Sequence, residues 1–448
     1  MAIELSEIIF TDQDDVVASG VEETIHNSGS ANTLAGNDII TATGYSSGIS
    51  NGGTLNTDDG NDTLTGTGAY GIVINYSSII DTGKGNDVIT GISNWAANRG
   101  NGGLVNRGTF NTSEGNDIIT GTGYSGGVAG FSNRGTFDTG EGNDIITGTN
   151  YAGTGNVSNF SGGPGISNIG ILCEDGGLFQ CGISTINTGD GNDTITGIFN
   201  NISDAYGGNG INNKIGTIDT GDGNDIITGI SQYGIGINNE IGTMDTGGGN
   251  DIITGMGGIR NDGTFNTGNG DDSIIANRDF PNYALENFNF IGTGNGNDII
   301  TSTGVIYNEG VINTGNGDDS IIVDGGMDDI TGTTYGIYNN GGNINTGNGN
   351  DSIIANEGFE SAENSSGSWF LGEGEDYIKG YGSGDFYGGN GNEILELTPG
   401  TYTVGIWDRV VFAKGNSLML ASEFEKLKAG DQMYDFTSLT AGQIIVVA

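Results

Sequence analysis

Thirteen aspartates recur along the chain, each closing a short glycine-rich phrase, and regularly spaced carboxylates are suited to holding a cation. Clear copies of the phrase are TGKGNDVITG at 82–91, TGEGNDIITG at 139–148 and TGDGNDIITG at 220–229. Successive aspartates lie 21 to 49 residues apart. A repeat of this length indicates a solenoid in which one supersecondary unit stacks on the next. The aspartates are Asp38, Asp62, Asp87, Asp117, Asp144, Asp193, Asp225, Asp251, Asp272, Asp298, Asp319, Asp351 and Asp376.

The phrase T-G-x-G-N-D-x-I-T supplies oxygen ligands of the kind that calcium prefers. Its glycines adopt backbone conformations that a Cβ atom blocks, so carbonyl oxygens are free to turn toward one point. Calcium takes about six to eight oxygens, more than one loop provides, whereas two loops stacked in register provide enough. We therefore expect several Ca²⁺ ions between adjacent coils, with the recurring aspartates as ligands. The alternative is a stack of Asx and glycine turns without metal.

The phrase resembles the nonapeptide G-G-x-G-x-D-x-U-x of RTX calcium-binding repeat proteins of bacteria, where U is a large aliphatic residue. The likeness is tighter in GEGEDYIKGYGSGDFYGGNGNEILEL at 372–397, which places Asp376, Asp385 and Glu393 nine and eight residues apart. The resemblance implies ions between successive turns, a small two-edged β-roll at 371–397, and Asp385 as a further ligand. Two departures are a threonine in place of the first glycine and a period near 25 residues instead of nine.

Three copies of the phrase lack the glycine that follows the threonine. They are TLAGND at 33–38, TDDGND at 57–62 and TSEGND at 112–117. Because a side chain disfavours the backbone conformation that glycine allows, we expect poorer loop geometry and weaker calcium binding at these copies.

Each repeat contains three short β-like runs separated by turn residues, as in GFSNRGTFDTGEGNDIITG at 130–148. The runs are too short and too rich in glycine for helices. They predict an all-β fold, a right-handed parallel β-helix in which each coil rises by about 4.8 Å. The second residue after each loop aspartate is aliphatic in every copy, as an internal column requires. We also expect a stacked amide ladder of Asn51, Asn106, Asn133, Asn168 and Asn261.

The chain divides by composition into a cap at 1–35, a β-helix at 36–370, the β-roll at 371–397 and a C-terminal segment at 398–448. The end of that segment resembles the tails of cyanobacterial and other bacterial RTX proteins that leave the cell by type I secretion. A simple capping domain is the competing interpretation. Cys173 and Cys181 lie close enough in sequence to bridge one loop, and two loop thiols are the alternative.

The charge balance is strongly acidic, with 56 Asp and Glu against 12 Lys and Arg and a net charge of −44. This balance opposes binding to nucleic acid and anionic membranes and attracts divalent cations. Carboxylates repeated at coil spacing repel by roughly 1 kcal/mol per pair in water, and by more when buried. The chain has neither an N-terminal secretory signal pattern nor an apolar run of about 18 residues for membrane insertion. We expect a secreted protein, disordered without calcium and folded with it.

The sequence contains none of the nucleophile, zinc or phosphate-loop motifs of common enzymes, so we do not expect an enzyme. We expect a calcium-binding structural protein of a cell-surface layer, sheath or extracellular fibre. It would self-associate into homo-oligomers or filaments, with cell-surface polysaccharide as a possible further partner. An adhesin or an ice-binding protein is the first alternative, and a polysaccharide-modifying enzyme the second.

The first alternative depends on the outward positions of the strand that follows each loop. These positions are β-branched, and when stacked they would form a flat stripe of the kind that marks an interface. Coverage of the stripe by long inserts, such as 150–186, is the competing expectation. The pairs are Ile39/Thr41, Thr63/Thr65, Val88/Thr90, Ile118/Thr120, Ile145/Thr147, Thr194/Thr196, Ile226/Thr228 and Ile252/Thr254.

Overall fold

The computed structural model of the protein describes residues 2–94, 102–124, 129–151, 163–169, 183–200, 208–278, 283–327, 333–361 and 367–448. Cys173 and Cys181 lie outside these residues. The chain forms two compact units, unit 1 with residues 1–247 and 254–257, and unit 2 with residues 248–253 and 258–448. Strand β26 (Ile252–Met256) contributes residues to both. Among the described residues, no helix has the length and apolar content that crossing a membrane requires.

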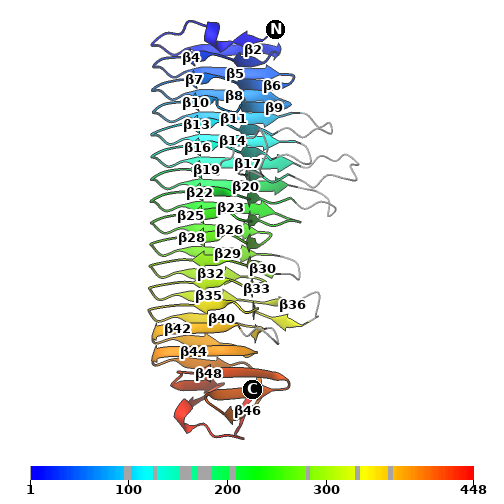
Figure 1. The fold of residues 1–448 in the computed structure, drawn as a ribbon, viewed down its shortest axis with the longest axis vertical. Helices are drawn as coiled ribbons and strands as arrows, with labels where there is room; N and C mark the ends of the chain where they lie inside the picture. The colour runs from blue at the N-terminus through cyan, green and yellow to red at the C-terminus, as the bar shows by residue number, and fades with distance from the viewer. Residues whose placement is uncertain are drawn as a thin grey trace, which may run out of the picture. The chain divides into compact units, whose positions relative to one another are not determined.

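Unit 1 is a stack of parallel strands in three sheets, which we name A, B and C (Figure 1). Sheet A holds β1 (Ile3–Glu4), β3 (Ile25–Asn27), β6 (Ser47–Asn51), β9 (Tyr70–Ile74), β12 (Leu104–Asn106), β15 (Phe131–Asn133), β18 (Ile166–Asn168), β21 (Ile211–Asn213) and β24 (Ile237–Asn239). Sheet B holds β2 (Val16–Glu22), β5 (Ile39–Gly44), β8 (Thr63–Gly68), β11 (Val88–Ser93), β14 (Ile118–Gly123), β17 (Ile145–Tyr151), β20 (Thr194–Asn200) and β23 (Ile226–Ser231). Sheet C holds β4 (Ser30–Asn32), β7 (Thr54–Asn56), β10 (Ile79–Asp81), β13 (Thr109–Asn111), β16 (Thr136–Asp138), β19 (Ser184–Asn187), β22 (Gly216–Asp219) and β25 (Thr243–Asp245).

Each coil of unit 1 runs from sheet B to sheet A to sheet C and then through the aspartate loop to sheet B of the next coil. Every coil contributes one buried residue per sheet to an internal column, as Ile119 of β14, Phe131 of β15 and Phe137 of β16 do. The expected amide ladder is confirmed: Asn106 donates to Asn133 over 2.9 Å, and Asn133 donates to Asn168 over 3.0 Å. Ile74 occupies the ladder position in β9, so the ladder is interrupted there.

Unit 2 begins with three parallel sheets of the same kind, for which we keep the letters A, B and C. Sheet A holds β27 (Ile259–Asn261), β30 (Tyr283–Asn287), β33 (Val305–Asn308), β38 (Ile337–Asn339) and β41 (Phe359–Glu360). Sheet B holds β29 (Ser273–Asn277), β32 (Ile299–Ser302), β35 (Ser320–Val323), β40 (Ser352–Ala355), β43 (Tyr377–Lys379), β45 (Ile394–Leu397), β49 (Lys426–Ala429) and β50 (Gln432–Asp435). Sheet C holds β28 (Thr264–Asn266), β31 (Phe290–Gly292), β34 (Val311–Asn313), β39 (Asn343–Asn345), β42 (Ser368–Gly374), β44 (Gly384–Gly391), β46 (Gly400–Ile406), β47 (Val410–Lys414), β48 (Ser417–Ser422) and β51 (Ile444–Val447). Strands β36 (Gly326–Met327) and β37 (Thr334–Tyr335) pair as a separate antiparallel hairpin.

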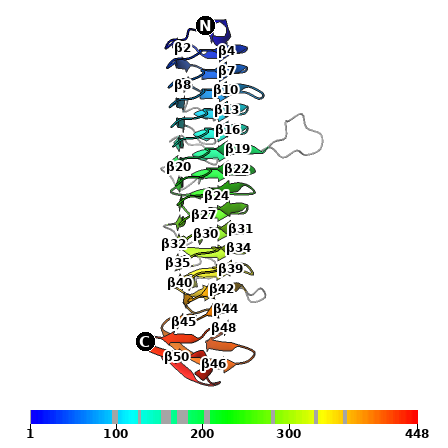
Figure 2. The same cartoon turned by 90° about the vertical axis from the view of Figure 1, so that its left-hand side faces the viewer.

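The C-terminal part of unit 2 changes from three strands per coil to two. Sheet A ends at β41, and the following parallel pairs are β42 with β44 and β43 with β45. Trp369 stacks on Phe386 with ring centroids 4.4 Å apart, filling the narrower interior. Antiparallel pairing of β46, β47, β48 and β51 then closes the unit (Figure 2). The fold is therefore an all-β parallel β-helix with a short two-stranded segment near its C-terminus.

The first 35 residues do more than the cap that the sequence predicts. Strands β2, β3 and β4 form a complete coil that pairs in parallel with β5, β6 and β7. Ile25 and Ala31 are buried in its interior. Only β1 and the short 3-10 helix η1 (Leu5–Glu7) precede that coil, with Leu5 fully buried against it. The coil is hard to recognise in sequence because its turns lack the glycine phrase.

Candidate metal centre

The recurring aspartates form a buried column in each unit, and their carboxylates bond to the neighbouring coil. The backbone N–H of Asp62 donates to Oδ1 of Asp87, that of Asp87 to Oδ1 of Asp117, and that of Asp117 to Oδ1 of Asp144, each over 2.8 Å. In unit 2 the N–H of Asp298 donates to Asp319 over 2.8 Å in the same way. The acid column of unit 1 comprises Asp38, Asp62, Asp87, Asp117, Asp144, Asp193 and Asp225, and that of unit 2 comprises Asp251, Asp272, Asp298, Asp319, Asp351 and Asp376, all at most 1% exposed.

A row of buried threonines faces the second carboxylate oxygen. Thr33 and Thr82, each five residues before a column aspartate, donate their hydroxyl protons to Oδ2 of Asp38 and Asp87. A threonine hydroxyl has one proton to donate, and in other copies of the loop a different acceptor receives it. Thr112, for example, donates to the carbonyl oxygen of Thr139 over 3.2 Å. The row explains why this chain has threonine where the RTX phrase has glycine. Its recurrence five residues before every column aspartate except Asp376 is the sequence signal that predicts it.

Several column aspartates keep a buried Oδ2 atom without a hydrogen-bond partner. A buried carboxylate oxygen left in this state is costly and calls for a proton or another cation. A proton on Oδ2 would donate to the threonine hydroxyl, and a metal ion would bind the oxygen directly. The atoms are Oδ2 of Asp62, Asp117, Asp144, Asp193, Asp272, Asp298, Asp319, Asp351 and Asp376.

The second glycine of the loop lines a narrow, oxygen-rich space between coils. Gly85 has φ +144°, and a Cβ atom there would lie 1.6 Å from the carbonyl oxygen of Gly60 in the preceding coil. A Cβ atom on Gly60 would likewise lie 1.7 Å from the carbonyl oxygen of Gly36, and it would lie 3.2 Å from Oδ1 of Asp62. Carbonyl and carboxylate oxygens therefore lie close together where a side chain is excluded. These are hard ligands that suit calcium better than softer metals.

Burial raises the pKa of several column carboxyl groups. The pKa of Asp62, Asp117 and Asp193 rises to about 6, and that of Asp87 and Asp144 to about 7. Loss of hydration is the largest cause, and the charges of neighbouring column aspartates add to it for Asp87 and Asp144. The hydrogen bond from the backbone N–H of the preceding column aspartate opposes the shift, and at Asp87 the hydrogen bond from Thr82 does so too. The column thus resists being fully ionised without a compensating cation.

The three copies without the glycine keep the loop conformation. Leu34, Asp58 and Ser113 have φ of 63°, 56° and 65°, in the left-handed region that glycine occupies elsewhere. An asparagine two residues earlier stabilises each turn, as when the N–H of Leu34 donates to Oδ1 of Asn32 over 2.7 Å. The expectation of poorer geometry is not met in the backbone, although the conformation carries a strain cost.

Asp385, predicted as a further ligand of the two-edged β-roll, lies outside the acid column. It lies on β44, where Nη1 of Arg409 contacts its Oδ1 at 2.6 Å. The guanidinium of Arg409 also lies over the ring of Tyr387, 5.7 Å from its centroid. The spacing of nine residues from Asp376 moves Asp385 to sheet C, because the coil at this point needs 17 residues to return to the loop position, where Glu393 stands.

In unit 1 the outer side of the aspartate loops carries an exposed asparagine ladder. The N–H of Asn86 donates to Oδ1 of Asn61, and that of Asn116 donates to Oδ1 of Asn86, each over 2.7 Å. These asparagines immediately precede the column aspartates. They hold successive loops in register from outside while the aspartates do so from inside.

Sheet B of unit 1 presents an uncharged, β-branched face to solvent. The central rank is seven consecutive threonines paired in register, and Ile118 beside it is 43% exposed. From β5 to β23, the first three outward positions of each strand, 21 in all, are Thr, Ile or Val, and the longer strands β17 and β20 add Tyr151 and Asn200. The 21 positions are Ile39, Thr41, Thr43, Thr63, Thr65, Thr67, Val88, Thr90, Ile92, Ile118, Thr120, Thr122, Ile145, Thr147, Thr149, Thr194, Thr196, Ile198, Ile226, Thr228 and Ile230. We call this set the threonine face.

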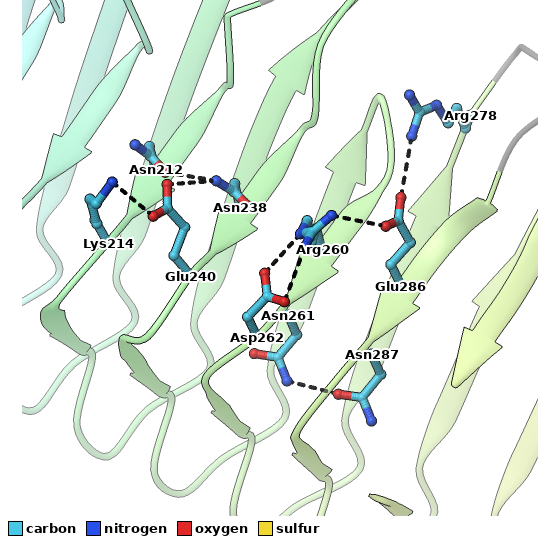
Figure 3. A network of polar contacts seen from close by, with 10 residues as sticks. All are labelled: Asn212, Lys214, Asn238, Glu240, Arg260, Asn261, Asp262, Arg278, Glu286 and Asn287. Atoms are coloured by element: carbon cyan, nitrogen blue, oxygen red, sulfur yellow. Dashed lines mark hydrogen bonds and ion pairs between the residues drawn. The ribbon is translucent and has the colours of Figure 1, made fainter. Parts of the chain in front are cut away.

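Sheet A of unit 2 carries a cluster of ion pairs that the sequence did not indicate (Figure 3). Arg260 bonds to Asp262 over 2.7 Å and to Glu286 over 3.4 Å, and Arg278 lies 4.0 Å from Glu286. The guanidinium of Arg260 also stacks 4.7 Å from the ring centroid of Phe288. Both arginines are paired with carboxylates of the same face, so we interpret the cluster as a structural network. In unit 1, Lys214 and Glu240 form a separate pair at 3.1 Å.

No family model and no curated protein matches the chain. A solved structure that it resembles is that of a hyperactive, Ca²⁺-dependent, β-helical antifreeze protein from an Antarctic bacterium. The likeness covers 98% of this chain and 95% of that one, with 16% identity and a TM-score of 0.42. At this similarity we draw nothing from it about what the present chain binds.

The acid column fits a cation but is not a complete cage of side chains. Among the residues that the structure describes, no three His, Cys, Asp or Glu side chains converge as a metal site. Each column aspartate also uses Oδ1 for a backbone hydrogen bond, as Asp117 does. A bound calcium ion would therefore take Oδ2 from the aspartate and complete its shell with backbone carbonyls and water.

Proposed function

We propose that the protein is a calcium-stabilised, extracellular β-helix that binds an ordered surface, ice being the first to test, through the threonine face. The observation that supports this proposal is the residue composition of the threonine face. A chain with a net charge of −44 keeps 21 neighbouring outward positions free of any charged residue. Such a face has no evident role in solubility, and large uncharged patches mark interaction sites.

The chemistry of the face suits a regular, hydrogen-bonding surface. Threonines repeat at about 4.8 Å from strand to strand, and outward positions repeat at about 6.6 Å along each strand. Each threonine offers a methyl group and a hydroxyl group in one fixed plane. Because β-branched side chains have few χ1 rotamers, little entropy is lost when the face meets a rigid partner.

Calcium has a supporting role in this proposal. The column aspartates and the carbonyl oxygens of the loop glycines would hold the ions between coils. Neutralising the column would fix the loop edge and keep sheet B flat and in register. A folded state that needs calcium is consistent with use outside the cell.

The decisive experiment measures ice binding by the full chain in calcium, by thermal hysteresis and by partition into growing ice. Thr120→Lys, Thr147→Lys and Thr228→Lys, combined, should abolish both while leaving the calcium-dependent circular dichroism unchanged. Thr136→Lys is the matched control, since Thr136 is an exposed strand threonine on sheet C. Wild-type protein that neither slows ice growth nor enters ice would contradict ice as the surface.

Side-by-side association of two copies through the same face is the second candidate. Its supporting observation is the apolar rank of the face, in which Ile39, Ile118, Ile145 and Ile226 are each 40–43% exposed. Such an assembly would fit a structural role in a cell-surface layer or fibre. Sedimentation velocity separates the candidates: copies that pair through the face should become monomers in the triple-lysine variant.

A further inference from the structure

The acid column of unit 2 continues past Asp376 into the C-terminal segment, with glutamates in place of aspartates. The N–H of Ile394 donates to the carbonyl oxygen of Asp376 over 2.8 Å, and that of Lys426 donates to the carbonyl oxygen of Glu393 over 3.1 Å. Glu393 and Glu425 thus occupy the next two column positions. The N–H of Glu393 donates to Oε2 of Glu425 over 3.1 Å, repeating the hydrogen bond between successive aspartates.

Glu393 is a fully buried carboxylate without a compensating partner. Its side chain is 0% exposed, and neither Oε1 nor Oε2 has a hydrogen-bond partner. The lysines that follow Glu425 are engaged elsewhere, Lys426 by Asp435 and Lys428 by Glu396. Burial and the adjoining carboxyl group of Glu425 raise the pKa of Glu393 to about 7. An unpaired carboxylate at this depth requires a proton or a metal ion.

The surroundings of Glu393 favour an oxygen-liganded metal ion. A Cβ atom on Gly391 would lie 2.4 Å from Oε1 of Glu393 and 1.5 Å from the carbonyl oxygen of Gly374. This carbonyl oxygen and the buried carboxylate therefore border the same narrow space. Glu425 is exposed at its outer side, so an ion and its waters can enter from solvent.

We propose that Glu393 and Glu425 bind one divalent cation, calcium, which fastens the antiparallel C-terminal segment to the last parallel coils. The site differs from the aspartate column in residue type and in purpose. Glu425 belongs to the link between β48 and β49, so the ion would join a segment that no aspartate loop reaches. Without the ion, repulsion between the two carboxylates should loosen β49 and β50.

Hydrogen exchange of the full chain, first stripped of metal and then given calcium chloride, tests the site. Calcium at ten times its dissociation constant should slow exchange of the amides of residues 426–435 by about tenfold. Glu425→Gln and Glu393→Gln should remove that protection. Glu423→Gln, an exposed carboxylate two residues before Glu425, should keep it.

Two results would overturn the proposal. One is a rate of exchange at 426–435 that does not change with calcium in the wild type. The other is a metal-free Glu393→Gln variant as protected as the calcium-loaded wild type, which would show that the pair holds only a proton. Amides of β11–β17 report separately on the aspartate column of the proposed function. If calcium leaves their exchange unchanged while it slows exchange at 426–435, calcium binding by the aspartate column is contradicted and the glutamate site is supported.

Discussion

The backbone N–H of Asp87 donates a hydrogen bond of 2.8 Å to Oδ1 of Asp117, a residue 30 positions later in the chain. This contact places the buried carboxylate of Asp117 against the backbone of Asp87. Among the described residues, no basic side chain lies between these two. The same oxygen that fixes the register of two coils therefore carries a charge that the coils must tolerate. Stability of the column should depend on which cation, proton or metal, balances that charge.

The first prediction concerns pH in metal-free protein. Because the folded-state pKa values of Asp87 and Asp144 are about 7, far above the ordinary value, the folded state binds protons that the unfolded state releases. This stabilisation is fully present below about pH 4 and is lost progressively as pH rises from about 4 to about 7. The melting temperature by circular dichroism should fall across this window and remain nearly constant with saturating calcium.

Ionic strength supplies the control for that titration. Repulsion among the many exposed acids also grows with pH, but salt screens exposed charges and hardly affects buried ones. The fall should therefore persist in about 0.5 M sodium chloride, where the Debye length is only a few ångströms. A melting temperature that rises with pH in metal-free protein would contradict the assignment of the column as the titrating group.

The second prediction concerns Asp117→Asn. The amide oxygen still accepts the N–H of Asp87, and the new NH₂ group can donate to the hydroxyl of Thr112. At pH 8 without metal, removing one buried charge should stabilise the protein by about 1–3 kcal/mol, given the raised pKa of Asp117. In calcium the variant should instead be less stable than the wild type, because it lacks one carboxylate ligand of the ion.

Denaturant titrations with and without calcium measure this reversal. Asp222→Asn, at an exposed loop position in the same unit, is the matched control and should change little in either condition. An equal change in stability of Asp117→Asn with and without calcium would mean that the carboxylate does not bind calcium.

Much of this fold could be predicted from the sequence. The inward aliphatic residues, such as Ile119 and Ile146, recur at a fixed distance from each loop, and the strand period of two then fixes which face is buried. The asparagine ladder, as between Asn106 and Asn133, follows from the same register. These features are local in sequence and repeat in every coil, so each copy reinforces the interpretation of the others.

The parts that could not be predicted depend on positions outside the repeat. Glu425 reaches the acid column through a segment with no glycine phrase, and only the pairing of β45 with β49 places it there. Asp385 is paired with Arg409, a residue outside the repeat, and the nine-residue spacing does not predict that contact. The calcium ligation of Asp38 to Asp376 remains a prediction, supported by burial and orphan oxygens.

The third prediction concerns the buried threonine row. Thr82→Val keeps the shape of the side chain but removes the hydroxyl that donates to Oδ2 of Asp87. Losing a hydrogen bond to a buried carboxylate should cost about 1–3 kcal/mol of unfolding free energy in calcium. Thr82→Ser, which keeps the hydroxyl, should recover most of that loss. Equal losses in both variants would assign the row to packing of the methyl group.

The last prediction separates backbone strain from steric exclusion at the loop glycines. Gly85→Ala adds a Cβ atom 1.6 Å from the carbonyl oxygen of Gly60, so two loops must move apart. Gly415→Ala also stands at a positive φ, 65° against 144° at Gly85, but nothing lies within 4 Å of the added atom. The Gly415 variant should lose only about 1 kcal/mol, the cost of the left-handed conformation. The Gly85 variant should lose several times more and should also bind calcium more weakly, because the space between adjacent loops holds the carbonyl and carboxylate oxygens. Similar losses at both positions, read from calcium-loaded thermal melts, would mean that the loops are spaced widely enough to accept a methyl group.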